Sequence, residues 1–172
     1  MDDEDLLDNT EGLTLLELLT REGVDLREVT LTAEVEARLQ LALVDWSKES
    51  VTISMPVGPH AFNGSGNVHG GAIATLVDVS AGLAATISSG YRPGVETIVT
   101  ADLHVRYLGR AKGALLLARS RVLRAGKMLV VVECTVRDDL DNIVAVADFS
   151  SMIVPLRQPL PGVQATTRSP DL

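Results

Sequence analysis

One stretch of the chain, His69–Ser88, most constrains how the rest can fold. Drawn as a helix, it carries apolar residues on nearly every side, and its one acidic side chain is Asp78. A helix that is apolar almost all round is buried in a core rather than laid on a surface. Ser89, Gly90 and Pro93 follow directly and predict where the helix ends. We therefore expect one long central helix that other elements must cover.

Short β-type segments lie on both sides of this helix. Two precede it, at 39–46 and 50–57, and their partial alternation predicts a hairpin. Four more follow, at 97–108, 114–123, 128–137 and 143–154. The links between these four are short enough for antiparallel hairpins, which predicts a four-strand meander. The order predicts an α+β fold in which an antiparallel sheet wraps around one central helix.

The segment 97–108 has two different faces. Ala101, Leu103, Val105 and Tyr107 alternate with Asp102, His104 and Arg106. Successive side chains of a strand point to opposite sides of the sheet. The polar side is therefore expected to meet water or to line an interface.

The chain divides into three parts, and its excess acidic charge lies in the first of them. Residues 1–28 hold ten acidic and two basic residues, whereas the remainder holds 13 of each. We expect an acidic N-terminal extension over 1–38, partly helical or disordered, a folded domain over 39–155, and a loose tail over 156–172. Within the extension, Thr14 and Glu17 form a capping-box pattern that predicts a short helix, and a helical turn is expected near 32–38. An acidic leader also argues against a nucleic-acid partner, because such binding depends on Lys and Arg meeting phosphates.

Composition favours a cytoplasmic protein without a membrane partner. Cys134 is the one cysteine, which excludes an intramolecular disulfide and a thiolate metal cluster. The first residues lack the basic and apolar regions of a secretory signal, and no 18-residue window is uninterruptedly apolar. The three histidines, His60, His69 and His104, lack a metal-ligand spacing. We therefore expect no metal and no cofactor.

Asp78 is the residue whose position most asks for an explanation. Its neighbours one helical turn away are Ala74, Thr75, Ala81 and Gly82, so no cation on the same helix neutralises it. A carboxylate on an apolar helix is costly unless it is paired or used. Two interpretations stay open from these residues alone: a structural aspartate bonded by Thr75 or by strand amides, and a catalytic one.

The segment 63–71, with sequence NGSGNVHGG, leads into the helix. Glycines let a backbone approach a ligand closely, and the first amides of a helix have no partner inside it. Such amides can hold a developing oxyanion. A Gly-rich helix start is also common in plain loops, and His69 is equally compatible with a structural hydrogen bond at the helix entry.

Helix geometry restricts how Gly70 and Asp78 can cooperate. They are eight residues apart, which is roughly 12 Å along a helix axis at about 1.5 Å per residue. An aspartate side chain reaches only a few ångströms, so one carbonyl cannot contact both groups of the same chain. If they share a reaction centre, the carboxylate must come from a second copy whose helix runs antiparallel, as in a two-fold dimer.

These motifs together resemble a known family. Asn63, His69-Gly70-Gly71 and Asp78, at this spacing, are similar to the hotdog-fold acyl-CoA thioesterases of the phenylacetate-degradation (PaaI-like) type, and the later stretch 100–111, TADLHVRYLGRA, resembles that family's central strand and its exit turn. The similarity covers about residues 39–155 and leaves out the first 35 or so. It implies a hotdog fold and a thioester hydrolase that releases free acid and CoA.

The resemblance also implies residue roles. Asp78 would act as general base or nucleophile, and the Gly70 amide of the other subunit would polarise the carbonyl. Asn63 would hold the attacking water or the thioester, His69 would support the loop, and Thr100 would orient the base or water. Gly71 is placed with the substrate-binding residues.

Coenzyme A enters as part of the substrate, so its phosphates need cations. Candidates at strand ends and turns are Arg106, Arg110, Lys112, Arg124 and Lys127. Each is equally explained as a solvated hairpin charge. The expected assembly is a homodimer or a homotetramer built as a dimer of dimers, with active sites at the subunit interface.

Three rival functions remain: a non-catalytic acyl-CoA-binding hotdog module, a hydratase of enoyl thioesters, and a structural assembly protein. A binding module of a regulator would need an attached DNA-binding segment, and a hydratase would need a His beside the Asp near a helix start. Acyl specificity is left undetermined. The chain has only five aromatic residues that could favour an aromatic acyl group, so we lean slightly toward general or aliphatic thioesters as substrates.

Overall fold

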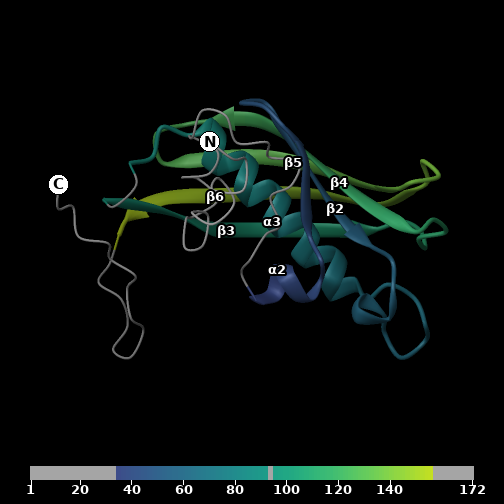
Figure 1. Cartoon of the computed structure of the whole chain (residues 1–172). Coiled ribbons are helices and arrows are strands. Elements are labelled where there is room, and N and C mark those ends of the chain that lie inside the picture. The colour runs from purple at the N-terminus through teal and green to yellow at the C-terminus, as the bar shows by residue number, and fades with distance from the viewer. Residues whose placement is uncertain (1–33, 93–94, 157–172) are drawn as a thin grey trace, which may run out of the picture.

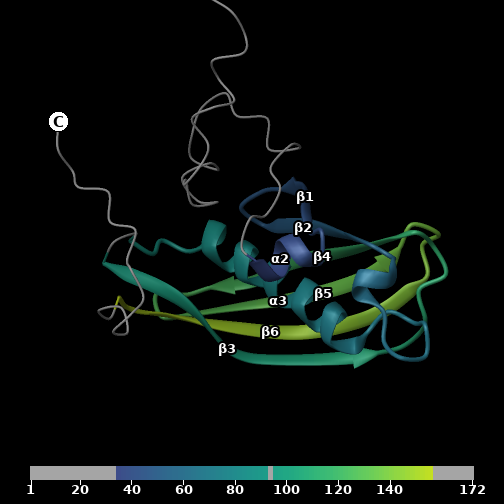
Figure 2. The ribbon, with the colours of Figure 1, turned by 60° about the horizontal axis from the view of Figure 1, so that its bottom comes forward.

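The computed structural model describes residues 34–92 and 95–156. Its elements, in chain order, are α2 (Glu34–Arg38), β1 (Ala42–Trp46), β2 (Ser50–Pro56), the 3-10 turn η3 (Pro59–Ala61), α3 (Gly70–Ser88), β3 (Glu96–Tyr107), β4 (Leu115–Ala125), β5 (Leu129–Asp138) and β6 (Ile143–Pro155). The strands form one six-stranded sheet in the order β1-β2-β4-β5-β6-β3, with every neighbouring pair antiparallel. Figures 1 and 2 show the sheet curving around α3, which confirms the expected architecture.

The central helix begins and ends where the apolar pattern predicts. Its buried residues are Ala72, Ile73, Leu76, Val77, Ser80, Ala81, Leu83, Ala84 and Ala85. They pack against β2, β4, β5, β6 and β3, so five strands cover the helix. By length and composition alone α3 could also cross a membrane. Core helices of water-soluble domains pass the same test, and the packing of α3 on the sheet places it among them.

The first strand starts later than the sequence pattern suggests. The predicted strand at 39–46 begins at Ala42, because the preceding residues close α2. Gln40 takes a left-handed conformation with a φ of 55°, and the amides of Gln40 and Leu41 donate back to Ala37 and Glu36. This is a common way to end a helix. The helical turn expected near 32–38 is observed as α2, and the helix expected near Thr14 lies outside the described residues.

The core between helix and sheet follows from strict alternation in β5. Val130, Val132, Cys134 and Val136 are buried toward α3, while the residues between them are partly exposed. Burial raises the pKa of the Cys134 thiol to about 11, although a hydrogen bond with Ser120 acts in the opposite direction. This buried cysteine is therefore a small core side chain.

The predicted four-strand meander is wrong in one link. β4, β5 and β6 are consecutive hairpin neighbours, but β3 pairs with β6 and not with β4. The seven residues from 108 to 114 therefore cross from one edge of the sheet past two strands. At about 3.3 Å per extended residue they can span roughly 23 Å, which exceeds three strand spacings of about 4.8 Å. A link this long fits either pairing, so its length did not decide the topology.

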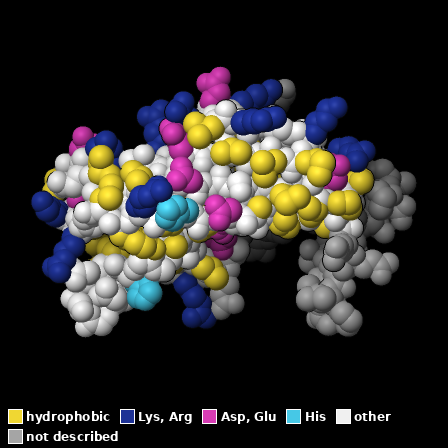
Figure 3. Space-filling model, turned by 180° about the vertical axis from the view of Figure 1, so that it is seen from behind, with side chains coloured by type: hydrophobic (Ala, Val, Ile, Leu, Met, Phe, Trp, Pro, Cys, Tyr) yellow, Lys and Arg dark blue, Asp and Glu magenta, His cyan; other side chains and the backbone are white. Residues whose placement is uncertain are grey.

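This pairing leaves β3 at an edge of the sheet, bonded to β6 on one side. The stretch that resembles the family's central strand is thus an edge strand in the single chain. Its polar face points away from α3, as the alternation predicts, since Asp102, His104 and Arg106 are exposed. Figure 3 shows the outer sheet face, where basic, acidic and apolar side chains are interspersed.

Candidate active site

The start of α3 holds the N–H groups of His69 and Gly71 in hydrogen bonds. The backbone N–H groups of residues 69–71 differ in their hydrogen-bond partners. His69 N–H donates to Ala61 O at 2.7 Å, and Gly71 N–H donates to the His69 Nδ1 atom at 2.8 Å. Within the described part of the chain, the Gly70 N–H between them has no hydrogen-bond partner. Gly70 therefore presents the one free amide of the three.

His69 makes this arrangement possible. It is the N-cap residue of α3, with extended backbone angles, and its ring accepts the hydrogen bond that a Ser or Asp side chain usually accepts at this position. Its carbonyl oxygen also accepts from Ile73 N–H at 3.2 Å. Histidine thus ties the loop to the helix through its backbone N–H, its carbonyl and its ring. The Gly71 N–H donates to the His69 ring and is therefore not free to bind a substrate in this arrangement.

The loop before the helix is organised by Asn63. Its Oδ1 atom accepts from the amides of Ser65 and Asn67, at 2.9 and 3.2 Å, and its own N–H donates to Asn67 O. Asparagine favours such turns because its side chain mimics a backbone carbonyl. The carbonyl side of the amide is thereby used. Among the described residues the Nδ2 group has no hydrogen-bond partner, so it is the end that can reach a ligand.

Asp78 lies eight residues further along the helix and is partly exposed. Its Oδ1 atom accepts a hydrogen bond from the Thr100 hydroxyl on β3 at 2.9 Å. Thr75, the partner that its spacing suggested, donates instead to Gly71 O of its own helix at 3.0 Å. The structure therefore brings Asp78 and Thr100 together and leaves Thr75 out.

A bulge in β3 aims Thr100 at the helix. Thr100 pairs with Ser151 and Asp102 pairs with Ser150, so two steps along β3 match one step along β6, with Ala101 as the extra residue. Without it, strict alternation would put Thr100 on the same outer face as Asp102. Bulges commonly re-aim a side chain next to functional sites. The sequence pattern alone gives no sign of this one.

Tyr107 is a site neighbour that the sequence reasoning did not select. Its hydroxyl donates to Gly70 O at 2.9 Å, from the last residue of β3. The alternation that puts Leu103 and Val105 on the inner face also puts Tyr107 there. That pattern was the signal by which Tyr107 could have been found.

A cavity of about 270 Å³ opens beside the helix start. Most of its lining is apolar, and Arg110 contributes the one charged side chain. It is lined by Val57, Phe62, Gly66, Asn67, Val68, Gly70, Ile73, Tyr107, Gly109, Arg110, Ala111 and Val144. The free Gly70 amide therefore borders a space large enough for part of a small ligand.

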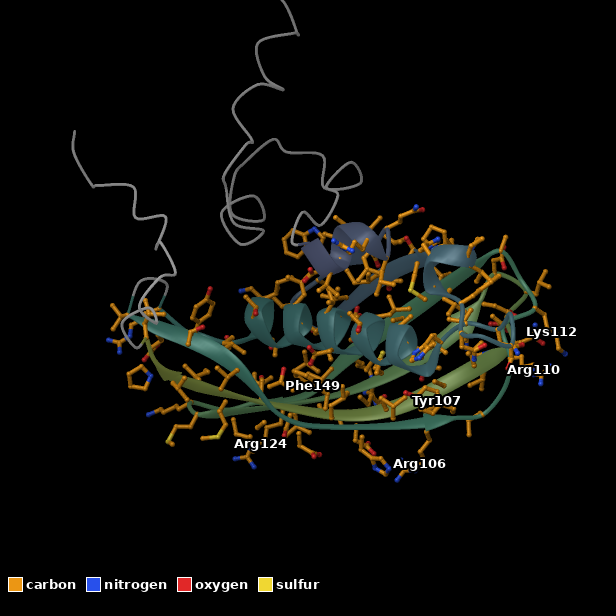
Figure 4. All side chains as sticks on the ribbon, turned by 90° about the horizontal axis from the view of Figure 1, so that it is seen from below. Arg106, Tyr107, Arg110, Lys112, Arg124 and Phe149 are labelled. Carbon is orange, nitrogen blue, oxygen red and sulfur yellow. The ribbon has the colours of Figure 1, made fainter. Side chains whose placement is uncertain are left out.

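The five candidate cations do not gather in one place. Figure 4 shows Arg110 and Lys112 at the end of the molecule that also holds Tyr107, and Arg124 toward the opposite end. Arg106 points away from the helix and pairs with Asp148 at 3.1 Å on the outer face. Lys127 lies in the exposed turn after β4. Of the five, Arg110 and Lys112 are nearest to the cavity.

A buried carboxylate holds the loop that carries these two residues. Asp138 is 2% exposed and accepts from the amides of Lys112 and Gly113 on the crossing link, and from Leu140 and Asn142 in the next turn. Burial acts to raise its pKa, but the hydrogen bonds from Lys112, Asn142 and Gly113 outweigh burial and hold it at about 2. Asp138 is a second residue that the sequence reasoning missed, because these contacts span 25 and 26 residues.

His60 lies in η3 and His104 on the outer face of β3. Among residues 34–92 and 95–156, no group of three or more His, Cys, Asp or Glu side chains could hold a metal ion. The chemistry of the described site therefore rests on one carboxylate, one hydroxyl, one free amide and the side chains around the cavity.

Comparison with known proteins places this geometry in context. The family model described as the thioesterase superfamily matches residues 65–145, which include Gly70, Asp78, Thr100 and Tyr107. A protein of Halobacterium salinarum described as a putative esterase is 42% identical over 79 residues, covering 46% of this chain. The matched part spans about half, 51%, of that relative.

Solved structures share the fold. The PaaI protein of the Escherichia coli phenylacetic acid degradation operon aligns with a TM-score of 0.63 at 18% identity, over 72% of this chain and 86% of that chain. The BH2602 protein of Bacillus halodurans, solved with CoA, aligns with a TM-score of 0.55 at 30% identity, over 60% of this chain and 66% of that chain. The thioesterase HI1161 of Haemophilus influenzae aligns with a TM-score of 0.64 at 18% identity, over 71% and 83%. The six-stranded antiparallel sheet around one long helix is thus the hotdog fold, which these solved structures share.

Proposed function

Residues 65–145 match the thioesterase-superfamily model and the chain has the hotdog fold, and from these findings we propose that the protein hydrolyses the thioester bond of an acyl-CoA to give a free acid and CoA. The observation that carries the proposal is that α3 presents two different reactive groups at two places along its length. Its start leaves one amide free beside a cavity, and its middle presents a carboxylate that a strand hydroxyl orients. These are the two groups that thioester hydrolysis needs.

The reaction balances with these groups alone. In one route Asp78 accepts a proton from water while the water oxygen attacks the thioester carbon. In the other, the Asp78 carboxylate attacks first and water then hydrolyses the mixed anhydride. Both routes pass through a carbonyl oxygen that gains negative charge, which the Gly70 N–H stabilises, and both expel the CoA sulfur as a thiolate. The thiolate takes up a proton, from protonated Asp78 in the first route and from water in the second, to give free CoA. Losing one such donor typically costs about 2.7–4 kcal/mol of transition-state stabilisation.

The two groups are proposed to come from different subunits. Along the helix axis Gly70 and Asp78 are roughly 12 Å apart, at about 1.5 Å per residue. A two-fold partner with an antiparallel α3 would bring the carboxylate of one copy to the amide of the other, twice per dimer. The free edge of β3, which carries Thr100, offers backbone groups for such a partner. We therefore propose a homodimer, alone or as half of a tetramer.

The substrate is proposed to lie with its acyl part or its thioester near the cavity and its CoA phosphates near cations. The CoA found with the Bacillus halodurans protein supports CoA binding by this kind of domain. Arg110, which lines the cavity, and Lys112, two residues further along the same link, are the first choice for the phosphates, and Arg106, Arg124 and Lys127 would serve from a partner subunit or not at all. The mechanism draws on no cofactor, and we place the enzyme in the cytoplasm.

Replacing Asp78 by Asn tests the proposal. The substitution keeps the shape and the Thr100 contact but removes the negative charge, so turnover of acyl-CoA should fall by about 10²–10⁴-fold, the usual contribution of a general base. Release of free CoA thiol is measured with a panel of aliphatic and aromatic acyl-CoAs. The matched control is Asp45→Asn, an exposed carboxylate on β1, which should keep wild-type turnover.

Two outcomes would overturn the proposal. Near-normal turnover by the Asp78→Asn variant would remove the carboxylate from the mechanism. Binding of acyl-CoA by the wild-type protein without release of thiol over many turnovers would instead favour a non-catalytic acyl-CoA-binding module.

A further inference from the structure

The peptide group between Gly70 and Gly71 is held at both of its polar ends. Its carbonyl oxygen, which belongs to Gly70, accepts the Tyr107 hydroxyl at 2.9 Å. Its N–H, which belongs to Gly71, donates to His69 Nδ1 at 2.8 Å. We infer that Tyr107 is a positioning residue, whose hydroxyl holds this peptide so that the neighbouring Gly70 N–H keeps one direction. The inference rests on the proposed function, in which that N–H stabilises the oxyanion.

Two consecutive glycines make such an anchor necessary. Glycine populates more backbone conformations than any other residue, and at a helix start the first turn has few internal hydrogen bonds to restrict it. The Tyr107 ring also lies against Gly70: a Cβ atom at that position would be 3.4–3.6 Å from three ring and hydroxyl atoms. Tyr107 therefore restricts Gly70 through a packed ring as well as through a hydrogen bond.

The hydroxyl acts on the backbone and not on the substrate. A phenol has one proton to donate, and in this structure Gly70 O receives it. Tyr107 also lines the cavity beside Gly70 and Ile73, so a thioester carbonyl that reaches the amide passes close to the ring. Its effect on the reaction would come through the orientation of the Gly70 N–H, since an oxyanion donor works only within a narrow range of distance and direction.

Where Tyr107 sits in the fold explains why it can serve as a fixed point. It is the last residue of β3 and pairs with the buried Ala145 of β6. Immediately after it, the Leu108 and Gly109 amides both donate to Val144 O. The Tyr107 backbone is thus tied to the sheet, and its side chain transfers that rigidity to the helix start.

The test compares Tyr107→Phe with the wild type. The variant keeps the ring and loses the hydroxyl, so we expect kcat to fall about tenfold while KM stays within about twofold, because small misplacements of a catalytic group are costly. Tyr91→Phe is the matched control, since Tyr91 is the one other tyrosine and its hydroxyl has no hydrogen-bond partner among the described residues. It should keep the wild-type kcat.

A second background separates positioning from a general structural role. In Gly70→Pro the amide proton is gone, so removing the Tyr107 hydroxyl should cost little further activity. An equal loss in both backgrounds, or a wild-type kcat for Tyr107→Phe, would overturn the inference. Backbone order at the Gly70 amide, measured by ¹⁵N relaxation without substrate, should fall in Tyr107→Phe, and unchanged order would also overturn it. This measurement reads the positioning role even if the wild-type protein turns over no acyl-CoA, which would refute the proposed function alone.

Discussion

The two halves of the candidate site are built very differently, although both lie on α3. At the helix start, His69, Gly70 and Gly71 share hydrogen bonds with Ala61, Ile73 and Tyr107, and of their three N–H groups only that of Gly70 has no partner among the described residues. At Asp78, one side-chain hydrogen bond from Thr100 is all that orients the carboxylate within the described chain. The amide half is thus fixed by several hydrogen bonds within its own chain, whereas the carboxylate half has only one such hydrogen bond among the described residues.

This difference indicates where a second subunit would matter. The amide half needs rigidity, because a backbone donor cannot adjust after the substrate binds without losing alignment. The carboxylate half depends on Thr100, which lies on the edge strand of the single chain. A partner that pairs along β3 would cover its free edge and complete the surroundings of Asp78. The half of the site with few contacts in the single chain is therefore the half that a second subunit would complete.

In the amide half, the largest expected effect comes from removing the free Gly70 amide proton. Gly70 is the first helical residue, where proline is well tolerated, and His69 before it has the extended angles that proline requires. Gly70→Pro should therefore keep the helix and lower kcat by about 10²–10³-fold, as for a lost oxyanion donor. Gly70→Ala keeps the N–H and places its Cβ 3.4 Å from the Tyr107 ring, an ordinary contact, so its kcat should stay within a few-fold of wild type.

The same variant tests whether the two halves belong to different subunits. A hybrid of Gly70→Pro and Asp78→Asn chains, purified with two different tags, has one site in which both groups are intact. In a dimer it should regain about half of the wild-type turnover, although each parent variant is nearly inactive. A hybrid as inactive as its parents would show that the halves do not combine across subunits.

The sequence predicted the elements of this fold better than their pairing. The apolar helix, its end at Ser89 and the alternation in each strand follow from local patterns, and the structure has them at nearly the same residues. The pairing of β3 with β6 depends on where a seven-residue link leads the chain, and neither its length nor its composition records that. Local sequence patterns therefore predict the helix and the strands, whereas the order of the strands in the sheet depends on long-range packing.

The candidate site divides in the same way. Asn63, His69, Gly70 and Asp78 stand out by type and spacing, and the side-chain hydrogen bonds of Asn63 and His69 are short-range bonds of the loop and the helix start. The contacts of Thr100, Tyr107 and Asp138 join residues 22, 37 and 26 positions apart. The Thr100 contact further requires the bulge at Ala101, which breaks the alternation that a sequence pattern relies on.

A smaller effect is expected at the carboxylate half from Thr100→Val. The variant keeps the shape of the side chain but removes the hydrogen bond to Asp78. A hydrogen bond to a charged group contributes about 1.5–3 kcal/mol, and solvent around these exposed groups reduces this, so kcat should fall about tenfold. Thr100→Ser keeps the hydroxyl and should retain most activity. Equal losses in both variants would point to packing and not to the hydroxyl.

The smallest effect on turnover, and the clearest one on stability, should come from Asp138→Asn beside the amide half. The pKa of Asp138 is held near 2 in the folded protein, against about 3.9 when unfolded. A lowered folded pKa contributes stability above pH 4 that is lost as the pH falls toward 2. Thermal unfolding between pH 7 and pH 2.5 should therefore show a lower midpoint for Asp138→Asn at pH 7 and a gap to wild type that narrows in acid.

The control for this experiment is again Asp45→Asn, which should follow the wild-type midpoint at every pH. Turnover of Asp138→Asn should stay within about threefold of wild type, because Tyr107 is also fixed by its pairing with β6 and not only by the link that Asp138 holds. A gap in unfolding midpoint that persists unchanged to pH 2.5 would mean that Asp138→Asn is destabilised by the loss of an acceptor oxygen for the backbone amides rather than by the loss of the negative charge.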